Sequence, residues 1–396
     1  MWTDAFLQQA RGVGDPLGDE TIRTVFDRGD ASALHTFMGQ LVANDEMPAN
    51  LPPEIAAFLA ATSTLPPWSD PAKIQMAERL FLEHGLVSMM ALVFASLPEC
   101  YVMKHGVKIL ALTRQLGEHT NRRVHQTASM VLGVMNAGGL SPTGRGIRQT
   151  QKVRLIHATI RYQMLKRAAA APASAAPMSV TDVVAGQGIS WDLNDDGWPI
   201  NQEDLAYTLL TFSYVIPMAM RRLGVTLTDE EFEAFLHAWN VTGHILGVRA
   251  DLMAHTVEDA TALFDAIKAR QAGASAGAAM LTNAMLDLVN EKLLRLPILH
   301  PLGPIAMRVL VGDTTAAMLG LNERDTWAVV LMHRLIASII KAIDAVAIAF
   351  GGFFRPFRWL APWLGQRIIV LLCDITARNG QPQPDVPPGW LTSRTR

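Results

Sequence analysis

Helix signals recur along this chain, and no alternating rhythm of strands and helices accompanies them. Ser69-Asp70-Pro71 is a helix cap followed by proline at the first helical position. Thr228-Asp229-Glu230-Glu231 has the pattern of a capping box at the start of another helix. Because helices without strands must bury their apolar faces against one another, we expect an all-α protein: a single large helical-bundle domain over residues 1–396.

The remaining helices follow from apolar periodicity and from turn residues. Asn201 to Arg222 predicts one long helix, capped by Asn201 and kinked by Pro217. The segment 86–97 is apolar all round and predicts a fully buried helix. Further helices are expected over 106–117, 119–135, 152–167, 280–296 and 326–350. Loops are expected over 168–179 and 269–279, and an extended tail over 381–396.

Charge and cysteine content exclude several classes of protein. Charged residues make up 18% of the chain and the net charge is −2, so we expect no nucleic-acid partner. Only two cysteines are present, Cys100 and Cys373, which is typical of a reducing compartment rather than of a disulfide scaffold. Neither lies in C-x-x-C-H, so covalent attachment of c-type haem is excluded.

The ends of the chain bear on localisation. The N-terminal residues lack a charged segment followed by an apolar core, so we expect no secretion signal and a cytoplasmic protein. The most lipid-like segment, 326–354, is interrupted by His333, Arg334, Lys341 and Asp344, which favours a buried or amphipathic helix over a membrane span. The aromatic and basic stretch within 351–367 is a candidate for peripheral membrane contact.

Motifs for nucleotide binding, serine hydrolysis and zinc proteolysis are missing from the sequence. A di-iron bundle needs Glu-x-x-His on two helices, and none of the 11 histidines has an acidic residue three positions before it. His237 and His244 are two helical turns apart, too far to share a zinc ion without other ligands. The acidic segment 192–197 resembles a calcium loop but lacks the glutamate that should be its twelfth ligand, so we expect a turn.

One helix, 152–167, carries a pattern that suits haem. Val153, His157, Ile160 and Met164 fall on one apolar stripe, with Arg154 and Arg161 one turn before and after the histidine. Imidazole can ligate iron, apolar neighbours can pack on porphyrin, and guanidinium groups can bind its propionates. The alternative is a core histidine that makes a hydrogen bond, with the two arginines in salt bridges on the helix face.

Three blocks of sequence resemble one family. TNRRVHQTASMVLGVMNAGGLSP (120–142) and KVRLIHATIR (152–161) are similar to the core of the family that holds the latex-clearing rubber oxygenases and the endoplasmic-reticulum-bound mpaB oxygenase. Residues 197–248 are similar to that family's G-x-P-I-N-x-E-D-L pattern and the W-x-x-x-G-x-x-L-G pattern that follows it. The resemblance covers residues 100–250 well and the flanks loosely.

The resemblance implies an all-helical fold that binds non-covalent haem b. His157 matches the proximal iron ligand, and Arg123 and Thr127 match the arginine and threonine of the distal side. Gln126 stands where the rubber oxygenases have a lysine that can cap the iron, which suggests an open, water-bound or five-coordinate iron. Arg123 and Thr127 share a helix face, so both side chains could donate hydrogen bonds to bound dioxygen.

The resemblance therefore predicts a haem-dependent dioxygenase-type enzyme with dioxygen and an apolar, unsaturated, isoprenoid-like molecule as partners. Catalytic roles are expected for Arg123, Gln126 and Thr127, iron ligation for His157, and contact with the cofactor for Arg154 and Arg161. Two alternatives stay open. One is a haem-binding sensor, carrier or peroxidase-like protein without oxygenase activity, and the other is a non-catalytic helical protein that docks on membranes.

Overall fold

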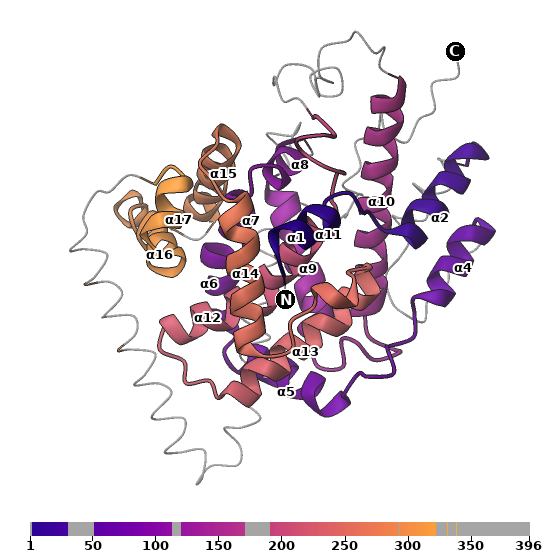
Figure 1. Ribbon diagram of the computed structural model, residues 1–396. Helices are drawn as coiled ribbons and strands as arrows, with labels where there is room; N and C mark the ends of the chain where they lie inside the picture. Colours follow the sequence, from indigo (N-terminus) through magenta and orange to yellow (C-terminus); the bar gives the residue numbers. More distant parts are fainter. Residues whose placement is uncertain are drawn as a thin grey trace.

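The computed structural model describes residues 2–30, 51–112, 120–170, 191–292 and 294–321, together with residues 331 and 338 (Figure 1). Every regular element in these ranges is a helix, and the strand-like pairing among them is an isolated bridge between Met103 and Ala272. The all-α prediction is therefore confirmed for the described part of the chain.

The elements of the N-terminal half are α1 (Asp4–Ala10), α2 (Pro16–Asp27), α4 (Pro53–Ala61), α5 (Pro71–Glu83), α6 (Gly85–Ala91), η1 (Leu92–Ser96), α7 (Leu97–Tyr101), α8 (Gly106–Leu112), α9 (Thr120–Met135) and α10 (Gly146–Ala170). Those of the C-terminal half are α11 (Gln202–Ser213), α12 (Val215–Arg222), α13 (Asp229–Leu246), η3 (Ala250–Leu252), α14 (Val257–Gln271), α15 (Ala276–Lys292), η4 (Pro297–Leu299), α16 (Leu302–Val311) and α17 (Asp313–Met318).

Helix α10 lies where two hydrophobic clusters meet. The larger cluster is built mainly by α1, α5–α9 and α11–α17 around buried aromatic rings such as Trp239, which stacks on Phe212 with ring centroids 4.8 Å apart. The smaller cluster fills the space between α2, α4 and α10. Because α10 packs against α2 on one side and against α9 and α13 on others, its side chains reach both clusters.

Local capping signals were accurate. The Asp70 carboxylate accepts hydrogen bonds from the first turn of α5, and Pro71 is its first residue. Thr228 and Glu231 form the complete capping box of α13, which ends at Gly247 in the left-handed conformation with φ 89°. These signals succeed because each depends on residues within about one helical turn of one another.

The expected single helix over 201–222 is two helices that meet at Tyr214. Pro217 cannot donate to the carbonyl of Ser213, and its ring crowds that carbonyl, so the break falls just before the proline. The predicted fully buried helix over 86–97 was also wrong in part, because Leu86 is 51% exposed and residues Leu92–Ser96 form a π-helical turn. Pro98 removes a helical hydrogen bond at this point, which favours the wider turn.

The loop predicted over 269–279 is shorter in the structure. Helix α14 continues to Gln271 and α15 begins at Ala276, because alanine-rich sequence favours helix rather than loop. Helix α10 extends to Ala170, and the rest of the predicted loop over 168–179 lies outside the described residues. Cys100 is free. Cys373, the extended tail over 381–396 and the stretch 351–367 also lie outside the described part, as does nearly all of the helix expected over 326–350.

Among the described helices, none alone has the length and apolar character needed to cross a membrane. The pair formed by Pro71–Glu83 and Gly85–Tyr101, bent by 92°, would meet that requirement by length and composition only.

Candidate functional site

His157 lies in the middle of α10, on the stripe that the sequence predicted. Ile160 and Met164 of this stripe are buried, and Val153 is half-buried against the larger cluster. The Nδ1 atom of His157 is buried and has no hydrogen-bond partner among the described residues. The alternative of a core histidine that makes a hydrogen bond is therefore not supported for this nitrogen.

The environment of His157 keeps its ring neutral. The pKa of His157 is lowered from 6.5 to about 3, mainly by burial and then by the nearby charge of Arg161, while the charge of Asp15 acts in the opposite direction. Burial is the largest cause of the lowered pKa of His157, although part of the residue's surface is accessible to solvent. A neutral imidazole has a nitrogen lone pair that can bind a ligand.

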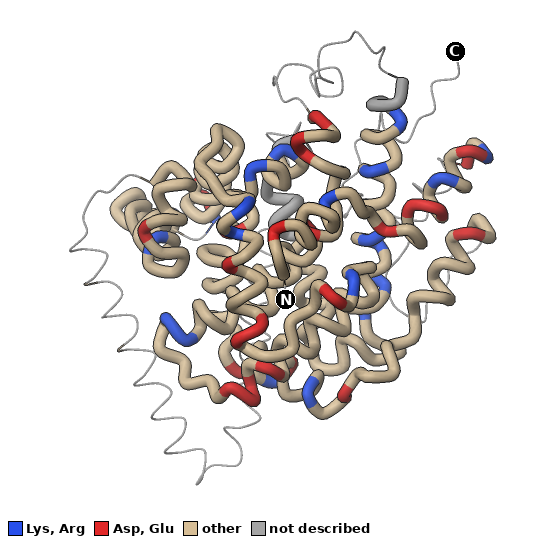
Figure 2. Tube along the Cα trace, in the orientation of Figure 1, with Lys and Arg blue, Asp and Glu red and all other residues tan. Residues whose placement is uncertain are grey.

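Arg154 and Arg161 flank His157, and both guanidinium groups bind carboxylates from the start of α2. Arg154 donates to Asp15 through Nε (2.6 Å) and Nη2 (2.7 Å). Arg161 donates through Nε to Asp19 (2.7 Å). Figure 2 shows Lys and Arg spaced along α10 and acidic residues on the neighbouring α2. Binding of a cofactor by these arginines stays a prediction, because the partners that the structure provides are protein carboxylates.

The residues expected on the oxygen side lie on α9, which packs against α10. Gln126 and Thr127 are half-buried on this helix. Arg123 belongs to the same helix, but its side chain lies outside the described part. The structure thus brings the two helices together, while the catalytic roles of these three residues stay predictions.

A glycine-rich loop sets how α9 approaches α10. A Cβ atom on Gly139 would overlap the carbonyl oxygens of Gly133 and Val134, which belong to the last turns of α9. A Cβ atom on Gly146, the first residue of α10, would lie 2.8 Å from the carbonyl oxygens of Gly133 and Gly139. The backbone of this loop therefore folds against the end of α9 at a distance that only glycine permits.

The block that begins at Gly197 ties several segments together next to α10. Asn201 caps α11, and Ile200 before it adopts a positive φ of 51°. The Gln202 amide donates to the carbonyl oxygens of Gly14 (2.8 Å) and Gly247 (2.9 Å). The carbonyl of Ile200 accepts a hydrogen bond from Arg161 (2.8 Å). In this protein the part of the pattern around Ile200 and Gln202 is therefore structural.

Glu203, the next residue of this block, is fully buried between two arginines. Its carboxylate lies 3.2 Å from Arg11 Nη1 and 2.9 Å from Arg270 Nε. Gln271 donates a further hydrogen bond of 3.0 Å. The four groups connect the N-terminal segment to the start of α11 and to the end of α14, which again indicates a structural role.

The sequence patterns did not identify Asp15 and Asp19 as partners of the arginines on α10. Asp15-Pro16 marks the start of α2, and the expected use of the aspartate is to cap that helix. Asp15 does occupy the cap position, but its side chain makes no capping hydrogen bond and binds Arg154 instead. No local signal distinguishes an aspartate that caps a helix from one that pairs with a distant arginine.

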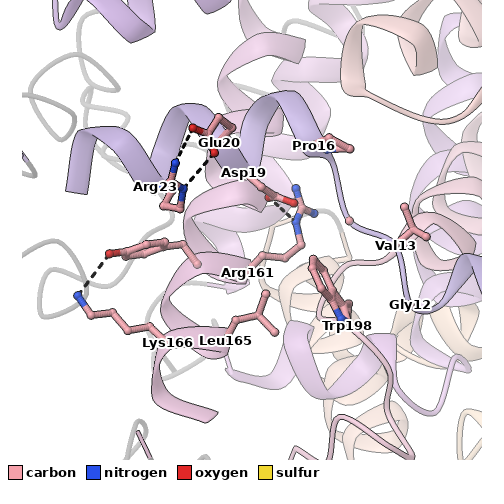
Figure 3. A pocket seen from close by; sticks show the side chains of 12 residues that line it. Gly12, Val13, Pro16, Asp19, Glu20, Arg23, Arg161, Leu165, Lys166 and Trp198 are labelled. Atoms are coloured by element: carbon pink, nitrogen blue, oxygen red, sulfur yellow. Dashed lines mark hydrogen bonds and ion pairs between the residues drawn. The ribbon is translucent and has the colours of Figure 1, made fainter. Parts of the chain in front are cut away.

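A surface pocket of about 500 Å³ lies beyond the Arg161–Asp19 pair (Figure 3). Its walls come from the segment 12–16, from α2, from the C-terminal half of α10 and from Trp198. The charged groups that face it are mostly paired, since Arg161 binds Asp19 and Arg23 binds Glu20. The pocket therefore offers mainly apolar surface beside the histidine-bearing helix.

The other candidate metal ligands among the described residues already contact protein groups. His237 accepts a hydrogen bond from the Asp70 backbone (2.8 Å), and the rings of His237 and His244 both meet the edge of Trp68. Among the described residues, His105, Asp195 and Asp196 are close enough to share an ion. Lys108 Nζ already lies 2.6 Å from Asp196, and the segment 192–197 is a turn, as expected.

Comparison with known proteins gives consistent results. A family model described as "ER-bound oxygenase mpaB/B'/Rubber oxygenase, catalytic domain" matches residues 86–342. The rubber oxygenase of Streptomyces sp. (strain K30) is 23% identical over 402 residues, which cover 94% of this chain and 90% of that protein. The solved structure of latex clearing protein LCP in the closed state has the same fold, with a TM-score of 0.71, 22% identity and 95% of each chain covered. Because the family model spans well over half of the sequence, the chain belongs to the family of mpaB and rubber oxygenase catalytic domains.

Proposed function

We propose that this protein is a haem b-dependent oxygenase that cleaves or oxygenates a carbon–carbon double bond in an apolar, isoprenoid-like substrate. The observation that carries the proposal is the buried Nδ1 atom of His157, which has no hydrogen-bond partner among the described residues, in a member of an oxygenase family. Dioxygen is the expected co-substrate.

The residues around His157 fit a haem. A buried polar atom without a partner is costly, and a bound metal removes that cost when the atom's side chain is a neutral imidazole. His157 would hold the iron, while the half-buried Val153 and the buried Ile160 and Met164 supply apolar surface on the same stripe of α10. Haem iron, when bound, supplies the redox chemistry that activates dioxygen.

The chain's own residues would orient and polarise the reactants. Arg123 and Thr127 are one turn apart on α9, so their side chains can donate hydrogen bonds to the same oxygen. Gln126 lies between them on a helix that packs against α10. An amide is a far weaker iron ligand than an amine, so Gln126 would leave the oxygen side accessible. Apolar side chains in the core would exclude water from the substrate.

The absorption spectrum of the purified protein, expressed with a haem precursor, tests the cofactor. We expect a Soret band and stoichiometric haem b by pyridine haemochrome assay. His157→Ala should remain folded by circular dichroism and lose the haem, whereas His300→Ala, in a turn outside α10, should keep it. A folded wild-type protein that refuses added hemin, or a His157→Ala variant that binds hemin like the wild type, would contradict the proposal.

Oxygen consumption with unsaturated terpenoids tests the reaction. An oxygenase should consume oxygen only when the alkene is present and should yield oxygenated or cleaved products by mass spectrometry. A haem-loaded protein that consumes none with any alkene in the series would favour the sensor or carrier alternative.

A further inference from the structure

Two ion pairs flank His157, and we call them together the Asp–Arg clasp: Asp15 with Arg154, and Asp19 with Arg161. Arg154 is 7% exposed and Arg161 is 1% exposed, so each guanidinium needs a buried or half-buried counter-charge. Figure 3 shows the second pair as a dashed line between α2 and α10. Both counter-charges come from residues 15–19, far from α10 in the sequence.

The backbone of this segment is shaped to bring the carboxylates close to α10. The Asp15 backbone N–H donates to Asp19 Oδ2 (2.9 Å), which links the two acids to each other. A Cβ atom on Gly14 would lie 2.6 Å from that same Asp19 oxygen. A Cβ atom on Gly18 would overlap Asp15 Oδ2 and touch Ala158 at 3.4 Å, one residue after His157. Glycine at these two positions therefore permits the close approach of α2 to α10.

Each arginine also reaches a third part of the fold. Arg154 donates to the carbonyl oxygen of Ile245 at the end of α13 (2.9 Å), and Arg161 donates to that of Ile200 before α11 (2.8 Å). The clasp thus joins α10 to α2, α11 and α13 one turn before and one turn after the histidine. Since no described hydrogen bond orients His157 through Nδ1, its position depends on how α10 itself is held.

We propose that Asp15 and Asp19 are positioning residues for His157, which hold α10 through Arg154 and Arg161 in the register that haem ligation requires. The proposal rests on the proposed function, in which His157 ligates the haem. It makes the segment 12–19 part of the haem site, although this segment precedes residues 86–342, the range that matches the family's catalytic domain. The arginines then act through protein carboxylates and not as partners of haem propionates.

Hemin titration of the full-length apoprotein tests the proposal. Asp15→Asn and Asp19→Asn keep the side-chain shape and remove the charge. We expect each to weaken hemin binding by about 10–100-fold, the effect usual for residues that orient a metal ligand. Glu20→Gln is the matched control, because Glu20 lies on α2, is exposed and pairs with Arg23 on the same helix. Its effect should stay below about threefold, as for other surface substitutions.

The variants must remain folded, which circular dichroism and thermal unfolding of the apoproteins establish. Asp19→Asn is the milder change, because Asp19 is partly exposed and accepts one hydrogen bond from Arg161, whereas Asp15 accepts two from Arg154. If Asp15→Asn fails to fold, the hemin affinity of Asp19→Asn therefore still tests the proposal. The frequency of the iron–imidazole stretch in the ferrous protein is a second measurement, and we expect the substitutions to shift it.

A His157→Gly background separates positioning from general stabilisation. Free imidazole added to this variant can ligate iron without being attached to α10, so the Asp15 and Asp19 substitutions should no longer weaken hemin binding there. The proposal would be overturned if the Asp15 and Asp19 substitutions weakened hemin binding by the same factor with His157 as in the His157→Gly background. It would also be overturned if these substitutions left hemin binding unchanged or made it tighter when His157 is present. Failure of the proposed function is distinct, because it appears as wild-type protein that binds no hemin or as binding that does not depend on His157.

Discussion

Replacing His157 by leucine should change how the stability of the apoprotein depends on pH. Burial lowers the pKa of His157 from 6.5 to about 3 in the fold. Because the folded state favours the neutral ring, this residue contributes stability that is fully present above pH 6.5 and is lost as the pH falls from 6.5 towards 3. Leucine does not titrate, so the variant lacks this contribution to acid sensitivity.

The two pKa values set the size of the effect. At about 1.4 kcal/mol for each pH unit between them, the complete loss is up to about 5 kcal/mol. At pH 5, about 1.5 units below the unfolded-state pKa, we expect about 2 kcal/mol of this to be lost. Urea unfolding followed by circular dichroism at pH 7.5, 6 and 5 measures it, as the difference between the wild type and His157→Leu at each pH.

Comparison of each variant with the wild type removes the contribution of all other titrating groups to the pH dependence of the unfolding free energy. Met164→Leu is the control, because Met164 lies on the same stripe of α10 and its replacement changes packing without removing a titratable group. Its unfolding free energy should follow the wild-type pH dependence. Parallel pH profiles for the wild type and His157→Leu would refute the reasoning, since they would mean that the ring is protonated as easily in the folded apoprotein as in the unfolded chain.

Two further predictions concern the helices that surround the site. Gly139→Ala should lower the free energy of unfolding, measured in urea, by about 1–3 kcal/mol, because the added Cβ would overlap backbone carbonyl oxygens of α9 that cannot easily move. Gly12→Ala should lower it less, because the nearest atom to its Cβ would be 3.5 Å away. Equal losses of stability in the two variants would contradict this account. In the haem site that we propose, Gln126→Lys should place an amine where it can ligate the iron and should shift the ferric absorption spectrum towards the six-coordinate low-spin form. An unchanged spectrum would show that this position does not reach the iron.

Local patterns predicted the parts of the fold that depend on neighbours in sequence. The Asp70 cap of α5 and the Thr228 capping box of α13 each involve residues within one turn, so the structure confirms them. Pro217 predicted a kink in one long helix, and the structure has a break at Tyr214, three residues before the proline. The π-helical turn at Leu92–Ser96 was not predicted, because apolar composition does not record which backbone hydrogen bond a following proline removes.

For the candidate site, periodicity placed His157 on an apolar face but could not identify what its flanking arginines bind. Spacing along one helix reveals neighbours three or four residues away. The carboxylate that neutralises Arg154 is 139 residues distant, and the one that neutralises Arg161 is 142 residues distant. Such pairs depend on how α2 packs against α10, which no local pattern encodes.

The sequence prediction assigned Arg154 and Arg161 to the cofactor because guanidinium groups one turn from the histidine can bind haem propionates. In the structure both arginines pair with aspartates of the α2 segment. A haem that depended on these arginines for its propionates would have to displace carboxylates already held at 2.6–2.7 Å. A haem held by His157 requires no such exchange, which is why we expect the loss of Asp15 to weaken hemin binding rather than to free an arginine for it.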